Sequence, residues 1–167
     1  MKALFIGRFQ PFHKGHLFVV QYILKQYDEV ILGIGSSQYS GTEQNPFSAE
    51  ERTMMITKTF QQEGISSFDI VNIPDLHNPP QWVDHVCQLV PSFDVVFTNN
   101  EFTCQLFTEK GFTVKETPVH EPEHYCGQTI RHAIASGKSW NYLVPQAVAE
   151  YIQKIHGEER IQNIVQS

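Results

Sequence analysis

Short apolar runs alternate with segments of helical periodicity along the 167 residues of this chain, and this alternation constrains the fold more than any other feature. The runs at 4–6, 30–34, 70–73 and 95–97 are apolar on successive positions and rich in β-branched residues, which is typical of strands buried on both faces. Connections of a few residues between strand and helix favour right-handed β–α–β units. We therefore predict an α/β fold: a doubly wound, Rossmann-like parallel sheet with helices on both faces and a helical C-terminal segment.

The helices expected between these strands are marked by apolar spacing and by end signals. In chain order they cover residues 17–27, a segment that opens with the capping box of residues 48–51, residues 79–89 with two prolines at the start, and residues 101–110. Gly111 stands where a helix-ending glycine is expected. From Gln128 onward the sequence predicts two or three further helices, broken near Gly137 and Gly157. No linker or internal repeat divides the chain, so we predict a single domain over residues 1–167.

Composition excludes several classes of protein. A formal net charge of −6 argues against a broad nucleic-acid surface, so an anionic ligand has to be met by a local cluster. No apolar run approaches the roughly 18 residues that a membrane span needs, and the first residues lack the apolar stretch of a signal peptide. We therefore expect a cytoplasmic protein with no nucleic-acid and no membrane partner. The three cysteines are too widely spaced to indicate a zinc site or a disulfide framework.

The loop from Gly7 to His16 follows the first strand and leads into the first helix, which is where a doubly wound fold binds phosphates. It carries neither of the glycine-rich phosphate motifs of dinucleotide-binding proteins and P-loop enzymes. His13 and His16, with Gly15 between them, instead form the pattern HxGH. Two imidazoles at a helix N-terminus can donate hydrogen bonds to phosphate oxygens, while the glycine lets the backbone approach and the helix dipole adds positive charge.

Such a site suits phosphoryl or nucleotidyl transfer. These reactions require alignment of the reactants and neutralisation of charge on phosphorus oxygens rather than a covalent nucleophile. From the residues alone, two other interpretations stay open: a metal pair, for which no third ligand is evident nearby, and two structural histidines. A second motif, HEPEH at residues 120–124, matches the HExxH pattern of zinc proteases. Because Pro122 disfavours the helix that such a zinc site needs, we expect neither helix nor zinc there.

The first loop also carries a resemblance. Its sequence GRFQPFHKGH, residues 7–16, resembles the nucleotidyltransferase superfamily that bears the HxGH motif, and most closely the archaeal-type nicotinamide mononucleotide adenylyltransferases. The similarity extends over nearly the whole chain, at IGSSQ (34–38), NPFSAEER (45–52), Trp82 after Ile-Pro-Asp, LVP (143–145) and GEER (157–160). The resemblance implies an enzyme that transfers AMP from ATP to nicotinamide mononucleotide (NMN), giving NAD and pyrophosphate by direct in-line attack with no covalent intermediate.

The same resemblance implies ligands and partners. ATP and NMN are the expected substrates, with Mg²⁺ carried by the ATP phosphates rather than by a dedicated metal site in the protein. The family also implies a homo-oligomer. Another adenylyl- or cytidylyltransferase of this superfamily, acting on a flavin, pantetheine or polyol phosphate, stays an alternative, and a non-catalytic nucleotide sensor is a further one. The first loop does not separate the enzymes, because it meets the nucleoside triphosphate that they share.

Site residues follow from the matched motifs. The catalytic residues that the resemblance implies are His13, His16 and Arg131. The residues implied to bind ATP and its phosphates are Gly7, Arg8, Gln10, Lys14, Gly15, Arg52, Gly127, Gln128 and Thr129. Those implied to bind the nicotinamide nucleotide are Ser36, Ser37, Asn78, Trp82 and Asn100, with the Trp82 ring stacked on the nicotinamide.

Four positions depart from the family pattern. Cys126 and Gln128 replace a serine and a threonine in the second signature, which reads YCGQTIR here. Gln44 stands where some members carry an arginine, and Pro79 stands where an asparagine usually precedes the tryptophan by three residues. Backbone N–H groups at a helix N-terminus bind phosphate whatever the side chains are. We therefore expect Cys126 and Gln128 to leave catalysis largely intact. Pro79 is expected to affect recognition of the carboxamide more.

Overall fold

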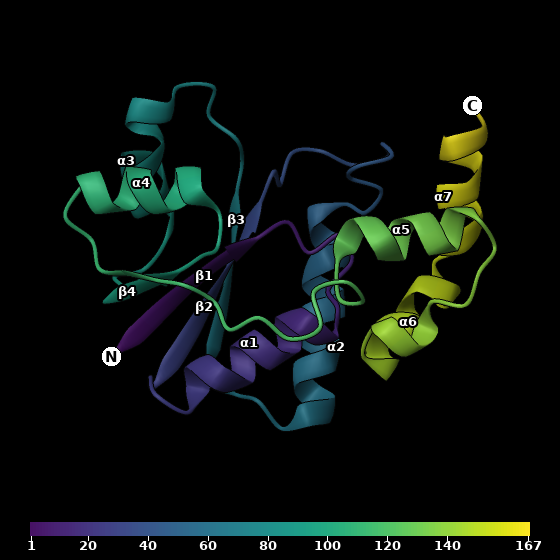
Figure 1. The fold of residues 1–167 in the computed structure, drawn as a ribbon, viewed down its shortest axis with the longest axis horizontal. Helices are drawn as coiled ribbons and strands as arrows, with labels where there is room; N and C mark the ends of the chain where they lie inside the picture. The colour runs from purple at the N-terminus through teal and green to yellow at the C-terminus, as the bar shows by residue number, and fades with distance from the viewer. The chain divides into compact units, whose positions relative to one another are not determined.

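Five parallel strands form one sheet in the computed structural model, which describes residues 1–167 (Figure 1). The strands are β1 Lys2–Gly7, β2 Glu29–Gly35, β3 Phe68–Ile73, β4 Val95–Phe97 and β5 Val114–Lys115. Their order across the sheet is β3-β2-β1-β4-β5, so the chain runs outward from β1 first in one direction and then in the other. This reversal between β1 and β4 confirms the predicted doubly wound parallel sheet.

Seven α-helices and one 3₁₀ turn connect and follow the strands. They are α1 Lys14–Leu24, α2 Ala49–Glu63, α3 Pro79–Leu89, α4 Glu101–Glu109, α5 Gly127–Ala135, η1 Asn141–Leu143, α6 Gln146–Lys154 and α7 Gly157–Gln166. Helix α2 starts at the predicted capping box: the Ser48 hydroxyl accepts from the Glu51 N–H at 3.2 Å, and Glu51 Oε1 accepts from the Ser48 N–H at 2.9 Å. Gly111 and Gly137 adopt φ of +88° and +71°, the left-handed region in which glycine ends a helix.

Helices cover both faces of the sheet. On one face, buried side chains of β1 to β4 pack against α3 and α4, and this cluster consists of Leu4, Ile31, Ile73, Val83, Val86, Val90, Val96 and Phe107. On the other face, the Phe97 ring of β4 contacts Tyr22 of α1 at a centroid distance of 6.3 Å. The central strands are buried from both sides, as their successive buried side chains show: Leu4 and Phe5 in β1, Val30, Ile31 and Leu32 in β2, and Val95, Val96 and Phe97 in β4.

The end of α1 and the presence of β5 differ from the sequence prediction. Helix α1 ends at Leu24, so Tyr27 lies in the turn that follows, where its ring packs edge-on against Phe97 at 5.7 Å. Its apolar character therefore reflects contact with the sheet rather than membership of the helix. Strand β5 is not predicted by the sequence, because two residues are too few to display a period.

Residues 116–126, between β5 and α5, contain no helix, as Pro122 led us to expect. His120, the first histidine of the HEPEH motif, stacks on the rings of Phe18 and Tyr125 at centroid distances of 4.4 and 5.6 Å. The motif therefore does not form the helical arrangement that a zinc protease requires.

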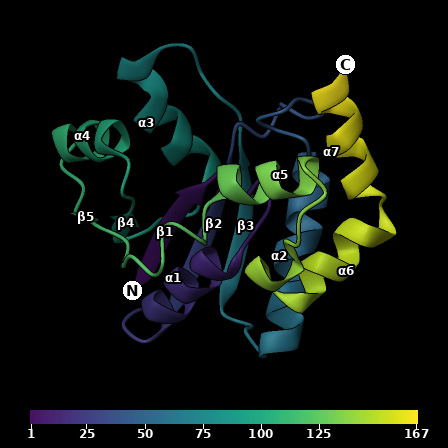
Figure 2. The ribbon, with the colours of Figure 1, turned by 45° about the vertical axis from the view of Figure 1, so that its right-hand side comes forward.

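The chain forms two compact units, each described here by itself. The sheet unit comprises residues 1–8, 19–37 and 67–118, and the helical unit comprises residues 9–18, 38–66 and 119–167. Within the helical unit, α2 packs against α6, and α7 packs against both α5 and α6 (Figure 2). A single domain over residues 1–167 stays a prediction.

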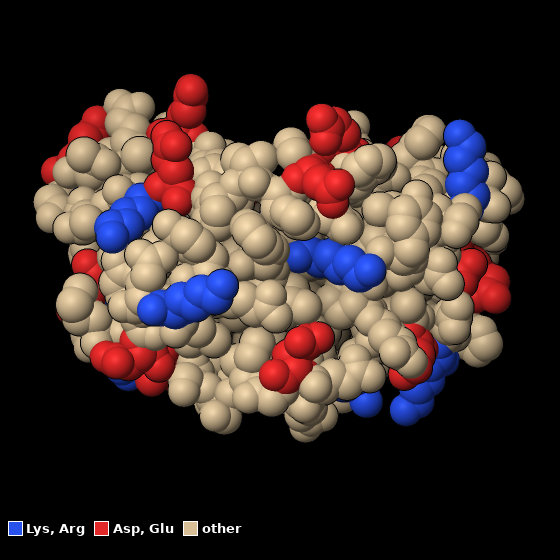
Figure 3. All heavy atoms as spheres, turned by 60° about the horizontal axis from the view of Figure 1, so that its bottom comes forward, with Lys and Arg blue, Asp and Glu red and all other residues tan.

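Charged side chains are sparse on the face drawn in Figure 3, where Lys and Arg lie interspersed with Asp and Glu. This distribution follows from a composition in which only 18% of residues are charged. No helix of the structure combines the length and the apolar character that crossing a bilayer requires.

Candidate active site

His13 and His16 form a reciprocal pair at the N-terminus of α1. The His13 N–H donates to His16 Nδ1 at 3.1 Å, and the His16 N–H donates to His13 Nδ1 at 3.3 Å. The two rings stack with their centroids 3.6 Å apart. Because each Nδ1 accepts a hydrogen bond, the proton of each neutral ring is assigned to Nε2. The turn therefore brings together two Nε2–H donors at the helix end where backbone N–H groups lack intrahelical partners.

Both imidazoles are neutral at pH 7 in this environment. Burial lowers the pKa of His13 to about 4, and burial together with the neighbouring His13 lowers the pKa of His16 well below its ordinary value. The rings of Phe9 and Phe12 are part of these surroundings, with centroids 4.8 and 5.4 Å from that of His16. The pair therefore offers hydrogen-bond donors without a positive charge of its own.

Gly15, between the two histidines, has no room for a side chain. A Cβ at this position would lie 2.9 Å from the Cβ of Tyr125 and 3.0 Å from the His13 ring. Tyr125 is the first residue of the second signature. The two signature segments therefore meet at Gly15, and a larger residue would push them apart.

The second signature continues into α5, and its arginine is tied to the first loop. Arg131 Nη1 donates to the Gln10 carbonyl at 2.7 Å. A Cβ on Gly127 would lie 2.8 Å from that nitrogen and 3.4 Å from the Gln10 oxygen. The glycine at the start of α5 therefore leaves the space through which the guanidinium reaches the loop.

Cys126 immediately precedes α5, and the pKa of its thiol shows which charge this helix end favours. Burial raises the pKa of its thiol, but the backbone N–H groups of Thr129 and Gln128 lower it, and the net shift is downward. The side chains of Gln128 and Thr129 are themselves exposed. The N-terminus of α5 therefore favours a negative charge through its backbone, so the replacement of serine and threonine leaves this property in place.

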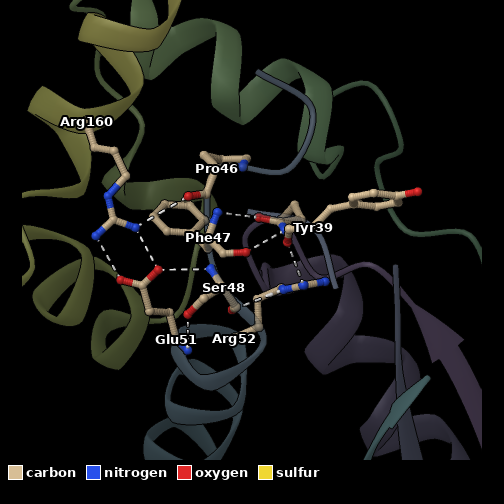
Figure 4. Close-up of polar contacts among 8 residues, drawn as sticks. Tyr39, Pro46, Phe47, Ser48, Glu51, Arg52 and Arg160 are labelled. Carbon is tan, nitrogen blue, oxygen red and sulfur yellow. Dashed lines mark hydrogen bonds and ion pairs between the residues drawn. The ribbon is translucent and has the colours of Figure 1, made fainter. Parts of the chain in front are cut away.

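Two residues implied to bind phosphate lie inside the helical unit. Gln10 is 2% exposed, and its amide donates to the Phe47 carbonyl at 2.8 Å and accepts from the Phe47 N–H at 3.0 Å. Arg52 is 0% exposed and donates to the carbonyls of Ser48 and Tyr39 at 3.2 and 3.3 Å (Figure 4). Both side chains thus hold the loop that precedes α2, and their contact with phosphate stays a prediction.

The two other cations implied to bind phosphates, Arg8 and Lys14, are exposed. Arg8 follows Gly7, the last residue of β1, and Lys14 is the first residue of α1. No group of three His, Cys, Asp or Glu side chains in the structure could hold a metal ion.

A cavity of about 300 Å³ lies in the sheet unit, and Trp82 is the one lining residue that was implied to bind the nicotinamide nucleotide. It is lined by Asp75, Leu76, His77, Pro79, Trp82, Phe102, Thr103 and Leu106. These residues follow β3 or belong to α3 and α4. Trp82 is half-buried and packs edge-on against Phe107 with centroids 5.7 Å apart, which fixes its ring at the wall of the cavity.

Other residues implied for this substrate hold the lining in place. The Ser36 hydroxyl donates to Asp75 Oδ2 at 2.9 Å, and the Asn100 side-chain oxygen accepts from the Thr103 N–H at 2.9 Å as the cap of α4. Asn78 precedes α3 and makes no capping hydrogen bond with its side chain. Sequence reasoning missed Asp75 and Thr103 as lining residues, although the Ile-Pro-Asp stretch was an available signal for Asp75.

The backbone at Ser37 and the side chain of Phe102 also belong to this part of the sheet unit. The Ser37 N–H donates to the carbonyl of Ile73, the last residue of β3, at 3.3 Å, so the backbone after β2 is tied to the neighbouring strand. Phe102 lines the cavity with 55% of its surface exposed, and nothing in the sequence pattern distinguished it from other aromatic residues.

The fold and the paired histidines define a class of protein, the nucleotidyltransferases. The chain belongs to the Cytidylyltransferase-like family, whose model matches residues 4–152. This match includes the HxGH turn, the loop that precedes α2 and the second signature.

Curated relatives place the chain more narrowly, within the archaeal-type nicotinamide-nucleotide adenylyltransferases. A relative from Thermoplasma volcanium is 44% identical over 163 residues, which cover 98% of this chain and 92% of the relative. One from Archaeoglobus fulgidus is 43% identical over 169 residues, which cover 98% and 97%. Both are named nicotinamide-nucleotide adenylyltransferase.

Solved structures share the fold. Two crystal structures of a bifunctional NMN adenylyltransferase/ADP ribose pyrophosphatase from Francisella tularensis match with TM-scores of 0.83 and 0.80 at 23% and 24% identity, and the second is complexed with AMP and a Mn ion. The matches cover 98% of this chain, which spans about half of the solved chains, 52% and 51%. At this identity the likeness bears on the fold alone.

Proposed function

We propose that this protein transfers AMP from ATP to NMN, giving NAD and releasing pyrophosphate. The observation that carries the proposal is the reciprocal His13–His16 pair at the N-terminus of α1, in a chain that matches curated nicotinamide-nucleotide adenylyltransferases over 98% of its length. The pair supplies hydrogen-bond donors and no nucleophile, which suits a direct transfer between two phosphates.

The chemical step in this proposal is an in-line displacement at the α-phosphorus of ATP. An oxygen of the NMN 5′-phosphate forms the new P–O bond while the bond to the pyrophosphate oxygen breaks, and the bonding electron pair leaves with pyrophosphate. Negative charge grows on the α-phosphate and on the departing oxygen. We assign its stabilisation to the Nε2–H groups of His13 and His16 and to the Arg131 guanidinium.

The remaining residues of the first loop and α5 are assigned to binding the triphosphate. Exposed Arg8 and Lys14 supply positive charge for the outer phosphates. Backbone and side-chain donors come from the first turn of α5, at Gly127, Gln128 and Thr129. Gln10 and Arg52 we assign to holding the loop before α2, because a direct phosphate contact would require their present hydrogen bonds to be exchanged. Gly7 and Gly15 allow close approach of the backbone.

The nicotinamide nucleotide is assigned to the cavity of the sheet unit. Trp82 offers the face of an aromatic ring to a positively charged pyridinium, which attracts it by dispersion and by a cation–π interaction. The other assigned contacts are Ser36, Ser37, Asn78 and Asn100. Since Pro79 stands where an asparagine is usual, the carboxamide has to be met by other polar groups of the lining, which include Asp75 and Thr103.

We propose that a divalent cation, Mg²⁺, enters with ATP as part of the substrate. A cation that keeps several waters and binds phosphate oxygens needs no all-protein cage. The cation supplies charge neutralisation on the triphosphate. Homo-oligomerisation and a single domain over residues 1–167 are further proposals from the family resemblance, and a cytoplasmic location stays a prediction.

A panel of acceptors tests the proposed function. The purified protein is incubated with MgATP or MgCTP and, in parallel, with NMN, nicotinic acid mononucleotide, FMN, 4′-phosphopantetheine or glycerol phosphate, and pyrophosphate release is measured. We expect pyrophosphate and NAD in equal amounts from ATP and NMN, and no release without an acceptor. Faster turnover with a flavin, pantetheine or polyol phosphate would contradict the NMN assignment, and silence with every acceptor would favour a nucleotide sensor.

A further inference from the structure

Arg160 of α7 forms an ion pair with Glu51 in the helical unit, and it lies outside the residues assigned to substrates. Its Nη1 and Nη2 donate to Oε1 and Oε2 of Glu51 at 2.6 and 2.9 Å, a bidentate geometry between residues 109 positions apart (Figure 4). The two side chains are only 33% and 17% exposed. Screening by solvent is therefore reduced compared with a surface pair.

The pair acts on the segment that leads into α2. Glu51 Oε1 also accepts the Ser48 N–H at 2.9 Å, so one carboxylate oxygen joins Arg160 to the capping box. Arg160 Nη1 lies 3.4 Å from the Pro46 carbonyl, and its guanidinium lies 5.9 Å from the centre of the Phe47 ring. Helix α7 thus holds this segment through an ion pair, a hydrogen bond and a ring contact.

Packing at the start of α7 adds to these contacts, which together we call the clasp of α7 on Phe47. A Cβ on Gly157 would lie 3.1 Å from Cε1 of Phe47, so the backbone of α7 lies directly against the ring. Phe47 itself is 0% exposed. The α7 backbone therefore fixes the position of the Phe47 ring, because a fully buried ring cannot move into solvent.

Phe47 passes this restraint to the first loop. Its N–H and carbonyl are both bonded to the side-chain amide of Gln10, at 3.0 and 2.8 Å. The carbonyl of Gln10 in turn accepts from Arg131 Nη1 at 2.7 Å. Gln10 lies three residues before His13, so the same residue is connected to Arg131 and to the HxGH turn.

We propose that Arg160 is a positioning residue for nucleotidyl transfer: through Glu51 and Phe47 it fixes Gln10, and through the Gln10 carbonyl it fixes the Arg131 guanidinium. Its kinetic readout rests on the proposed function. Because Arg131 is assigned to charge that develops in the transition state, the restraint should act on kcat more than on substrate binding.

Steady-state kinetics with ATP and NMN test this assignment. Arg160→Ala is expected to lower kcat by about tenfold or more, because small displacements of a positioned group are costly, while both KM values change less than about threefold. Arg160→Lys keeps the charge but not the bidentate geometry and should recover part of the loss. Glu51→Gln should resemble Arg160→Ala. The matched control is Glu159→Gln on α7, whose carboxylate is 65% exposed and which should keep wild-type kcat.

A double variant separates positioning from a general loss of stability. Arg160 contacts the ring of Phe47 and Gln10 bonds its backbone, so both act through Phe47. Arg160→Ala should therefore cost little further kcat in a Gln10→Ala background. Assays run well below each variant's unfolding midpoint. The proposal would be overturned if the fold-loss in kcat of the double variant equalled the product of the two single fold-losses. An unchanged kcat in Arg160→Ala would overturn it as well.

Amide hydrogen exchange gives a readout that does not depend on the substrate. The Phe47 N–H should exchange at least about tenfold faster in Arg160→Ala than in wild type or Glu159→Gln, because its hydrogen bond to Gln10 opens more often. Unchanged protection would sink the proposal even if the wild-type protein made no NAD. Failure of NAD formation in wild type, with the exchange result as expected, would count against the proposed function alone.

Discussion

Each imidazole of the HxGH turn uses one ring nitrogen to hold the turn and keeps the other as a donor. Removing either ring therefore removes a donor and also leaves a backbone N–H without its acceptor. Arg131 is similar, because its guanidinium holds the Gln10 carbonyl in the structure and is assigned to phosphate charge in the reaction. In this site the residues proposed for catalysis also maintain its shape.

His16→Ala and Arg131→Ala should each lower kcat by about 10² to 10³, the usual cost of losing one donor to developing negative charge. Turnover is measured as NAD formation at saturating ATP and NMN, with circular dichroism to verify folding. His132→Ala is the control, since His132 directly follows Arg131 in α5, is exposed and has no assigned contact. A folded variant that retained more than about a third of wild-type turnover would remove its residue from the catalytic set.

Among the helices, α3 carries Trp82, the residue proposed to stack on the nicotinamide. Its two prolines begin the helix and its apolar side packs Val83 and Val86 into the core, which leaves Trp82 at the cavity wall. The helix is thus anchored by its core side while its tryptophan remains available to a ligand. Trp140, the other tryptophan of the chain, is 5% exposed and lies in the helical unit.

Tryptophan fluorescence tests the role of α3. Adding NAD to Trp140→Phe should quench the emission of Trp82, whereas Trp82→Phe should respond weakly and bind NAD about 2- to 30-fold less tightly, as loss of a cation–π contact of about 0.5 to 2 kcal/mol implies. The alternative is a tryptophan that only packs on Phe107. Equal NAD affinity in Trp82→Phe and wild type, with quenching confined to Trp140, would support that alternative.

Predictability also differs among the elements. The capping box of α2 and the prolines of α3 lie within a few residues of the boundaries they set, so the sequence carries both partners of each signal. The contacts of Arg160 with Glu51 and of Gln10 with Phe47 join distant segments, and no spacing rule relates them. For the same reason the burial of Gln10 could not be predicted from the sequence, because it is decided by packing that no local pattern displays.

At the scale of the whole molecule, the buried histidines make stability depend on pH. The pKa of His13 is about 4 in the folded protein and about 6.5 in an unfolded chain, so between these values the unfolded chain binds more protons. Stability is therefore complete above about pH 6.5 and falls as the pH decreases toward 4, by up to about 3 kcal/mol for this one group. The lowered pKa of Glu51 acts in a separate window, below the ordinary value of 4.5.

Urea unfolding at pH 7.5, 6 and 5 measures this dependence. Replacing His13 by Gln removes the titrating group, so the loss of unfolding free energy between pH 7.5 and 5 should be smaller in His13→Gln than in wild type. His124→Gln, at an exposed histidine, should leave the slope unchanged. Parallel curves for His13→Gln and wild type would mean that His13 is not held neutral by burial.

The clasp of α7 on Phe47 has a consequence for the order in which the protein is made. Glu51 and Phe47 leave the ribosome long before their partner, because 109 residues separate Glu51 from Arg160. At about 5 to 20 residues per second this interval is about 5 to 20 seconds. During that time the nascent chain already contains HxGH and its first helix, but the segment before α2 still lacks the contacts that α7 provides. The site can therefore reach its final shape only after α7 has been synthesised.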